Sequence, residues 1–590
     1  YLILKILITL LISVMLGIYC YMSSGNLLVS LITIVLMYLP TELILVQLFQ
    51  YILSKIIKPK LIPKLDLQNG IPKESATFVV IPTIISQKEK LEEMFKKLEV
   101  YYIANKSKNI YFALLADVTA GEKEEEEFDE TISKLGVELV NKLNKKYPYE
   151  DFPKFHFIYR KRVWNDKEEC YLGWERKRGL LTQFNEYILK RSDNPFRVNT
   201  IDLNKIPKIK YVITLDADTE LVLNTGLELI GAASHILNIP EVNNGIVTKG
   251  YGIIQPRVGI SLNAADKSKF TKIYAGSAGT DSYTNAISDV YQDNFGEGIY
   301  TGKGIYDVEI FSNVLKDQIP ENTVLSHDLL EGSYLRCGLA SDIMLMDGYP
   351  TSYSAFKTRL SRWNRGDWQI IRWLKSKIKN KEGIKKKNPL NLISKYKILN
   401  NLVKSIFPIN ALILILFLVY INKYFKIWPL MLITIISIVI PYLIEIINKV
   451  VYKKDGEGIQ KTFYKSITGI KASCIKGILE IGTLPDKAYT MLNSITKTIY
   501  RVCKSKKHLL EWTTAEEAEK SAKTDLLSYY KNMWPNILFA LLLLISGNLN
   551  MLVIILSILW LITPGVMKYI SNKEKKLFAI EELNSEEQEY

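Results

Sequence analysis

The chain has 590 residues, of which 48% are apolar and 23% charged, and this length excludes a single simple core. Its five cysteines are scattered without close pairs, which excludes a disulfide framework or a zinc module and favours a reducing compartment. The formal net charge of +15 leaves three candidate partners, namely nucleic acid, an anionic membrane face and phosphate-bearing substrates.

Apolar stretches that are long enough, or nearly so, to cross a bilayer occur near both ends of the chain and once towards its middle. A transmembrane helix needs about 20 such residues. Six spans are predicted near residues 2–22, 27–52, 402–421, 427–447, 532–547 and 549–568. The resulting domains are two transmembrane helices (1–53), a soluble domain (74–375), a basic linker with two transmembrane helices (376–450), cytoplasmic and interfacial amphipathic helices (451–530), two further transmembrane helices (531–570) and a polar tail (571–590).

The distribution of lysine and arginine around these spans predicts their orientation. Cytoplasmic loops carry an excess of positive charge. The segments 55–64, 372–404 and 497–507 are basic, whereas the links 23–26 and 547–550 carry no charge. Only the link 422–426, with two lysines, argues weakly the other way. We therefore expect a multi-pass protein of the inner (cytoplasmic) membrane with every large loop, including the soluble domain, in the cytoplasm.

A segment between the fourth and fifth predicted spans has apolar residues at helical spacing. They run from Ala488 through Met491 and Ile495 to Val502, while Lys497 lies on another face. Such a helix can lie in the membrane interface with its cations near lipid headgroups. It can equally be an amphipathic helix packed on the soluble domain, and the sequence leaves both interpretations open.

The soluble domain begins an alternation of strands and helices at Ala76. Expected strands cover 76–81, 110–115, 155–159 and 211–215, the first ended by Pro82, and helical patterns separate them. Alternation of this kind predicts an α/β domain with a doubly wound, mostly parallel sheet, inserted between transmembrane helices. In such sheets ligands bind beyond the carboxyl ends of the strands.

Three aspartates stand at these strand ends. Asp117 follows the second strand, and the fourth runs directly into Asp216-Ala217-Asp218. Two carboxylates at such a position are hard oxygen ligands for Mg²⁺ or Mn²⁺, which then bridges to a diphosphate and offsets the charge of a departing group. An isolated Asp-x-Asp pair is weak evidence for a metal site, and Asp218-Thr219 can simply cap a turn. Its position after a buried strand favours the metal site.

A candidate base lies in the segment Ser326-His327-Asp328-Leu329-Leu330-Glu331-Gly332. Transfer of a sugar with inversion needs a group that accepts the proton of the acceptor hydroxyl. Asp328 is the candidate, with His327 and Glu331 as alternatives. The plainer interpretation of His327 is a neighbour that orients the loop.

Two clusters of cations accompany the aspartates. Arg359-Leu360-Ser361-Arg362-Trp363-Asn364-Arg365-Gly366-Asp367-Trp368-Gln369 combines guanidinium groups suited to diphosphate oxygens with indole faces suited to sugar rings. Trp174-Glu175-Arg176-Lys177-Arg178-Gly179 precedes a helix whose N-terminus can hold phosphate, although such a turn is more often ordinary surface. The glycine-rich segment 295–304 lacks the spacing of a phosphate loop, and we interpret it as close backbone packing beside an acceptor.

The order of these motifs resembles that of processive family 2 glycosyltransferases, which make cellulose, chitin and hyaluronan. Two positions depart from that pattern, because Arg359 stands where Gln is usual and Ser326-His327 where Thr-Glu is usual. With these departures, the sequence resembles more closely the glycosyltransferase part (family 84) of cyclic β-1,2-glucan synthases. The motifs that carry this second resemblance are 174–179, 296–298 with 301–307, 325–332, 362–369 and 508–515.

The resemblance implies a GT-A-like fold, UDP-glucose as donor, a divalent metal, and inverting transfer to the 2-hydroxyl of a growing β-glucan acceptor. It implies that full-length members continue into cyclisation and phosphorylase-like domains, and since the chain stops at Tyr590 we expect it to lack cyclisation and length control. Carried over to this sequence, the implied roles are Asp117 at uridine; Asp216 and Asp218 at metal and diphosphate; Asp328 as base; Arg362 at the diphosphate; Arg176 and Arg178 near the donor; and Trp363 and Gly302 beside the acceptor.

Three rival interpretations remain. The first is a synthase of another linear polysaccharide, such as a cellulose- or chitin-like polymer. The second is a polymer-conducting membrane protein whose transferase domain is vestigial. Nucleic-acid binding is disfavoured, because the basic residues flank the spans instead of interleaving with an exposed aromatic platform.

Overall fold

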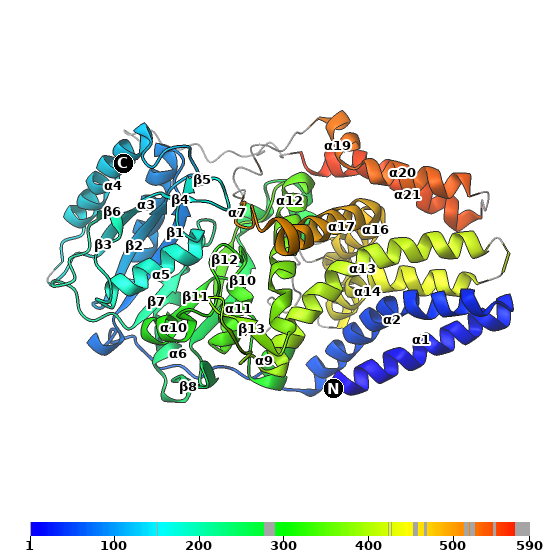
Figure 1. Cartoon of the computed structure of the whole chain (residues 1–590), viewed down its shortest axis with the longest axis horizontal. Coiled ribbons are helices and arrows are strands. Elements are labelled where there is room, and N and C mark those ends of the chain that lie inside the picture. The colour runs from blue at the N-terminus through cyan, green and yellow to red at the C-terminus, as the bar shows by residue number, and fades with distance from the viewer. Residues whose placement is uncertain are drawn as a thin grey trace.

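The computed structural model describes residues 2–149, 151–275, 289–422, 424–425, 427–451, 458–464, 469–512, 519, 525–546 and 550–572. An α/β part and a bundle of long apolar helices lie side by side (Figure 1). The predicted tail beyond residue 572 and the residues Thr513–Ala515 of one motif lie outside the described residues.

The α/β part is built on one eight-stranded sheet, and the predicted α/β class is confirmed. Six of the strands run in one direction, and only β6 and β11 oppose them. The sheet is therefore mostly parallel, as predicted. Its order is β12 (Cys337–Asp347), β10 (Ile253–Ile260), β11 (Gly304–Asp307), β7 (Tyr211–Thr214), β1 (Thr77–Ile84), β2 (Ile110–Asp117), β3 (Phe155–Arg160) and β6 (Phe196–Asn199).

Helices cover both faces of the sheet because alternate strand residues point to opposite sides. Val79 and Ile81 pack into one core with the apolar faces of α3 (Lys88–Ala104), α4 (Glu127–Lys146) and α6 (Thr225–Ser234). Phe78 and Val80 pack into the other, with α5 (Arg176–Ile188), α10 (Val308–Leu315) and α11 (Asp328–Tyr334). The sheet is doubly wound. Because six of its strands run in the same direction, their carboxyl ends share one edge of the sheet.

Pro82 does not end the first strand, contrary to the prediction. It pairs in register with Leu115 of β2, and β1 continues to Ile84. On its other side β1 pairs with β7 only as far as Val80. A proline is tolerated at an unpaired strand edge because no ladder hydrogen bond is lost there.

Five of the described helices are long and apolar enough to cross a membrane. They are α1 (Leu2–Ser24), α2 (Leu27–Ile56), α13 (Leu392–Asn422), α14 (Trp428–Val451) and α21 (Met551–Ile570). The fifth predicted span, 532–547, differs: α20 (Trp534–Ile545) has 12 residues, and a break at Met533 separates it from α19 (Leu526–Asn532). At about 1.5 Å per residue, α20 reaches only part of the way across a hydrocarbon core.

The helix ends that are joined by short links share one end of the bundle. Figure 1 shows the ends of α1, α13 and α20 and the starts of α2, α14 and α21 at the end farthest from the sheet, whereas the α/β part lies at the opposite end. As far as the structure describes them, the large loops thus share one side of the bundle, in agreement with the pattern of charges in the sequence.

Helix α17 (Leu484–Tyr500) joins the bundle to the α/β part. One face contacts α12 (Tyr353–Gln369), where Asn364 donates to the Met491 carbonyl at 3.3 Å. The other face leaves Leu492 and Ile499 exposed. The interpretation as a helix packed on the soluble domain is therefore confirmed for one face, and the second face still suits a membrane interface.

The remaining elements are short. They are β4 (Val163–Asn165), β5 (Cys170–Leu172), β8 (Glu241–Asn243), β9 (Ile246–Lys249), β13 (Lys377–Lys379), β14 (Lys385–Lys387), α7 (Leu262–Ala265), α8 (Lys269–Tyr274), α9 (Val290–Phe295), α15 (Ile459–Tyr464) and α16 (Ile470–Gly482), with 3₁₀ turns at Lys73–Ser75, Ile236–Asn238 and Ile370–Leu374 and a π-turn at Arg501–Ser505.

Candidate active site

The turn after β7 carries Asp216 and Asp218 and is fixed by β12. The Gly348 N–H donates to the Asp218 carbonyl at 3.1 Å, and Glu220 and Met346 exchange backbone hydrogen bonds of 2.6 and 3.2 Å. Both aspartates are partly exposed, in contrast to the fully buried strand that precedes them. The turn thus presents two carboxylates at the carboxyl edge of the sheet, as predicted.

A Gly-Lys-Gly turn places Lys303 beside these carboxylates. β11 is antiparallel to β7 and pairs Gly304 with Thr214, so the residue before Gly304 lies at the carboxyl edge. Gly302 and Gly304 have φ of +85° and +139°, a region that side chains disfavour. The Lys303 ammonium donates to Asp347 and lies 3.3 Å from Asp216 Oδ2. Asp347 in turn accepts from the Thr219 hydroxyl at 2.6 Å.

A second lysine reaches Asp216 from the first turn of α5. Lys177 Nζ lies 2.6 Å from Asp216 Oδ1 and donates to the Gly302 carbonyl at 2.9 Å. Burial lowers the pKa of Lys177, but the charges of Asp216 and Asp328 outweigh burial and raise it. Burial raises the pKa of Asp216, and the two lysines lower it overall. Asp216 is consequently an ionised carboxylate with a cation on each oxygen.

Neither Lys177 nor Lys303 was predicted as a site residue. Both lie inside motifs that the sequence singles out, 174–179 and 301–307. A group of carboxylates at a sheet edge needs nearby positive charge. This requirement could have pointed to the lysines of these two motifs as site residues.

Asp328 begins α11 and lies directly behind Gly302. A Cβ atom on Gly302 would stand 2.8 Å from Asp328 Oδ1. His327 Nδ1 lies 2.7 Å from Glu331 Oε1 and 3.7 Å from Asp328 Oδ1. The pairing with Glu331 supports the interpretation of His327 as an orienting neighbour. Burial raises the pKa of Asp328, and His327 and Lys177 moderate the rise. A partly exposed carboxylate with a raised pKa suits a proton acceptor.

The three predicted carboxylates converge. Lys177 interacts electrostatically with both Asp216 and Asp328, and Arg362 interacts with these two and with Asp218. Removal of the guanidinium from water is the main reason that the pKa of Arg362 is lowered to about 10. The group is chemically able to hold a cation, bind a diphosphate and accept a proton within one region.

Helix α12 contributes Arg362 together with Trp363. The Arg359 guanidinium lies 4.5 Å over the Trp363 ring, and the Arg362 guanidinium lies 5.7 Å from the ring centre of Trp512. A Cβ on Gly366 would come within 2.3 Å of Ser326 Cβ, so this glycine lets α12 approach the segment that carries Asp328. The two motifs, distant in sequence, are therefore neighbours.

Asp117 ends β2 and is nearly inaccessible. Arg160 Nη1 lies 3.3 Å from each Asp117 carboxylate oxygen. The same nitrogen donates to the Arg176 carbonyl at 2.9 Å, and Arg178 pairs with the buried Glu175. Arg160 was not predicted, and it ties the strand end to the segment 174–179. The predicted donor contacts of Asp117, Arg176 and Arg178 stay predictions.

The segment 506–512 connects α17 to the α/β part. Leu510 N–H donates to Glu168 at 2.8 Å, and His508 N–H donates to the Lys167 carbonyl at 3.0 Å. Glu511 lies 2.6 Å from Arg501 and 3.3 Å from Arg365 of α12. These contacts place Trp512 beside Arg362.

The residues present fit a divalent cation at the Asp-x-Asp turn. Asp216 and Asp218 provide carboxylate oxygens of the kind that Mg²⁺ and Mn²⁺ prefer. Among the described residues none donates a hydrogen bond to the Asp218 carboxylate, which leaves its oxygens available.

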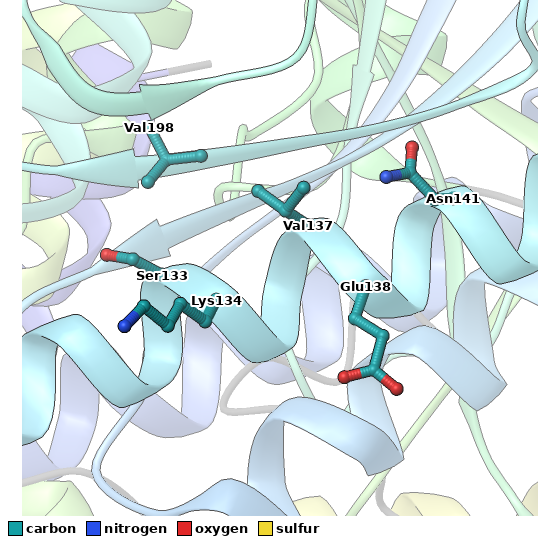
Figure 2. Close-up of a pocket in the computed structure, with 6 residues that line it drawn as sticks. All are labelled: Ser133, Lys134, Val137, Glu138, Asn141 and Val198. Carbon is teal, nitrogen blue, oxygen red and sulfur yellow. The ribbon is translucent and has the colours of Figure 1, made fainter.

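A shallow depression elsewhere on the sheet is separate from this group. Figure 2 shows it between α4 and β6, and its lining contains none of the residues above. The lining residues are Ser133, Lys134, Val137, Glu138, Asn141 and Val198.

Comparisons with known proteins bear on the family. No model of a known protein family matches the sequence. The chain is 32% identical over 553 residues, 92% of its length, to the cyclic beta-(1,2)-glucan synthase NdvB of Rhizobium meliloti (strain 1021). The match covers 19% of that synthase, so the chain spans a minor part of its relative.

Proposed function

Because the chain belongs, over the residues that match, to the cyclic β-(1,2)-glucan synthase family, we propose that it is an inverting, metal-dependent glycosyltransferase that transfers glucose from UDP-glucose to a growing β-1,2-glucan. The observation that carries the proposal is the convergence of Asp216, Asp218 and Asp328 around Lys177 and Arg362. A binding module without catalysis needs no proton acceptor beside a cation site.

In this proposal the donor diphosphate binds against Arg362 and Lys177, with Asp216 and Asp218 as ligands of Mg²⁺ or Mn²⁺. The bound ion supplies positive charge that stabilises the departing diphosphate. Arg362 and Lys177 add fixed positive charge at the same place and hold the donor in one orientation. We assign Asp117, Arg176 and Arg178 to the nucleoside end of the donor, and the contacts of Arg160 with Asp117 and with the Arg176 carbonyl support their grouping.

Asp328 accepts the proton of the acceptor 2-hydroxyl as its oxygen forms a bond to the anomeric carbon of the donor glucose. The bond between that carbon and the diphosphate oxygen breaks, and UDP leaves with the electron pair. Attack from the face opposite UDP inverts the anomeric configuration. Trp363 provides an aromatic face for the terminal acceptor sugar, and Gly302 keeps the space beside Asp328 open.

We further assign the sheet to the GT-A type and place the protein in the inner membrane with the α/β part in the cytoplasm. The basic segments on the α/β side of the helix bundle support this orientation. Cytoplasmic placement also gives the site access to nucleotide sugars. We also propose that cyclisation is carried out by further domains of a longer polypeptide, because the match covers 19% of the relative.

The test uses the purified chain in detergent or nanodiscs, a glucan acceptor, and a panel of UDP-sugars with Mg²⁺ or Mn²⁺. We expect acceptor-dependent UDP release with UDP-glucose and 2-linked glucose in methylation analysis of the product. Product with 4-linked residues would favour a cellulose-like synthase, and absence of UDP release from every donor would contradict the proposal.

A further inference from the structure

Lys303 occupies an unusual position, with its ammonium among three carboxylates. It donates to Asp347, lies 3.3 Å from Asp216 Oδ2 and interacts electrostatically with Asp218. Its side chain is 6% exposed, so water screens these interactions poorly. The Lys303 cation therefore already offsets part of the negative charge of the carboxylates that are expected to hold a divalent metal.

The backbone fixes this lysine where it is. Gly304 lets the chain pass close to β10, since a Cβ there would stand 2.3 Å from the Ile254 carbonyl oxygen. Asp347 is itself held by Thr219 at 2.6 Å. Lys177, by contrast, is 16% exposed and is bonded to Asp216 and a backbone carbonyl. Lys303 is thus the more firmly held of the two cations on Asp216.

The charges around the turn are nearly balanced without any bound ion. Four carboxylates, Asp216, Asp218, Asp328 and Asp347, stand against four cations, namely Lys177, Lys303, Arg362 and, beside Asp218, Lys97. A divalent cation alone gives this group an excess of positive charge. A divalent cation that binds together with a nucleoside diphosphate creates no such excess, because the diphosphate brings the compensating negative charge.

We propose that Lys303 is a positioning residue that acts as the resident counter-ion of Asp216, so that the protein binds a divalent cation weakly until a nucleoside diphosphate is present. This inference rests on the proposed function. The Lys303 ammonium lies 3.3 Å from Asp216 Oδ2, so an ion bound by Asp216 would be close to it, and like charges at such distances repel strongly in a poorly screened site. By thermodynamic reciprocity, the nucleotide then raises the affinity for metal as much as the metal raises the affinity for nucleotide.

The test measures Mn²⁺ affinity directly by electron paramagnetic resonance of free Mn²⁺, with and without UDP and with no acceptor present. We expect UDP to raise the Mn²⁺ affinity of the unmodified protein about tenfold or more. In Lys303→Met the Mn²⁺ affinity without UDP should rise by a similar factor, and UDP should add little. Lys303→Arg, which keeps the charge, should resemble the unmodified protein.

Lys97→Met is the matched control. Lys97 donates to the Ala217 carbonyl between the two aspartates but does not contact their carboxylates. It also lies close enough to interact with the charge of Asp218. If only general positive charge mattered, Lys97→Met and Lys303→Met would raise Mn²⁺ affinity alike, and that result would overturn the inference.

The unmodified protein gives a further test that does not depend on the folding of any variant. Nucleotide-free Mn²⁺ binding as tight as binding with UDP would overturn the role of Lys303 even if glucan is made. Absence of UDP binding and of UDP-glucose turnover would instead refute the proposed function, so the two failures are distinguishable.

Discussion

Replacement of Gly302 by alanine is a sharp probe of the placement of Asp328. Gly302 has φ of +85°, and a Cβ at this position would stand 2.8 Å from Asp328 Oδ1 and 3.1 Å from its Cγ. The substitution therefore has two effects. It strains the backbone, and it pushes the candidate base away from its position.

The size of each effect follows from the geometry. A non-glycine residue in the left-handed region costs about 1 kcal/mol of folding free energy. Ordinary van der Waals separation begins near 3.4 Å, so the new methyl and Asp328 Oδ1 must move apart by several tenths of an ångström. Misplacement of a reacting group by about 1 Å costs about a hundredfold in rate, so we expect kcat to fall by about tenfold.

Gly245→Ala separates the two effects. Gly245 has φ of +79°, and a Cβ there would meet nothing within 4 Å. Both variants should lose similar thermal stability, while only Gly302→Ala should lose kcat at saturating UDP-glucose and acceptor. UDP affinity should be preserved in both. Equal kcat for the two variants would refute the placement of Asp328 beside the reacting hydroxyl.

Four further predictions follow from the same site. Asp328→Asn should lower kcat at least about a hundredfold while UDP affinity in calorimetry is unchanged; turnover close to that of the unmodified protein would remove its role as base. Burial raises the pKa of Asp328, so kcat should fall as pH drops through that raised value. Lys177 lowers this pKa, so Lys177→Met should move the acid limb of the pH–rate profile to higher pH; an unmoved limb would contradict the electrostatic interaction between Lys177 and Asp328. Chelation by EDTA should abolish UDP release and Mg²⁺ or Mn²⁺ should restore it, and activity that persists in EDTA would exclude the metal. Trp363→Ala should raise the KM for acceptor with little change for UDP-glucose, and the reverse pattern would assign Trp363 to the donor.

The sequence predicted those strands and helices that are determined by runs of neighbouring residues. The apolar β2 strand, buried at all eight positions, and the strand that leads to Asp216 follow from runs of β-forming residues. Because parallel strands share a carboxyl edge, the aspartates after them could be expected to meet. The long apolar helices were equally visible, and the family resemblance drawn from the motifs is confirmed by the comparison with the glucan synthase.

The features that the sequence did not reveal depend on long-range pairing. Lys303 reaches Asp216 because β11 inserts antiparallel between β7 and β10, and nothing local to 301–307 specifies that insertion. Arg160 meets Asp117 across neighbouring strands for the same reason. Pro82 continues β1 because β7 is short. Helix α20 begins only at Trp534 because Pro535 is tolerated in the first turn of a helix and not in its interior.

The central claim is that this group of aspartates forms β-1,2-glucosidic bonds with inversion. It is tested most directly by NMR of oligosaccharide made from UDP-α-glucose by the unmodified chain, with the Asp328→Asn variant as the blank. The account predicts β-anomeric signals with linkage through position 2, present for the unmodified chain and lost in the variant. Product with α-anomeric configuration, or β-1,2 product that persists undiminished in the variant, would contradict it.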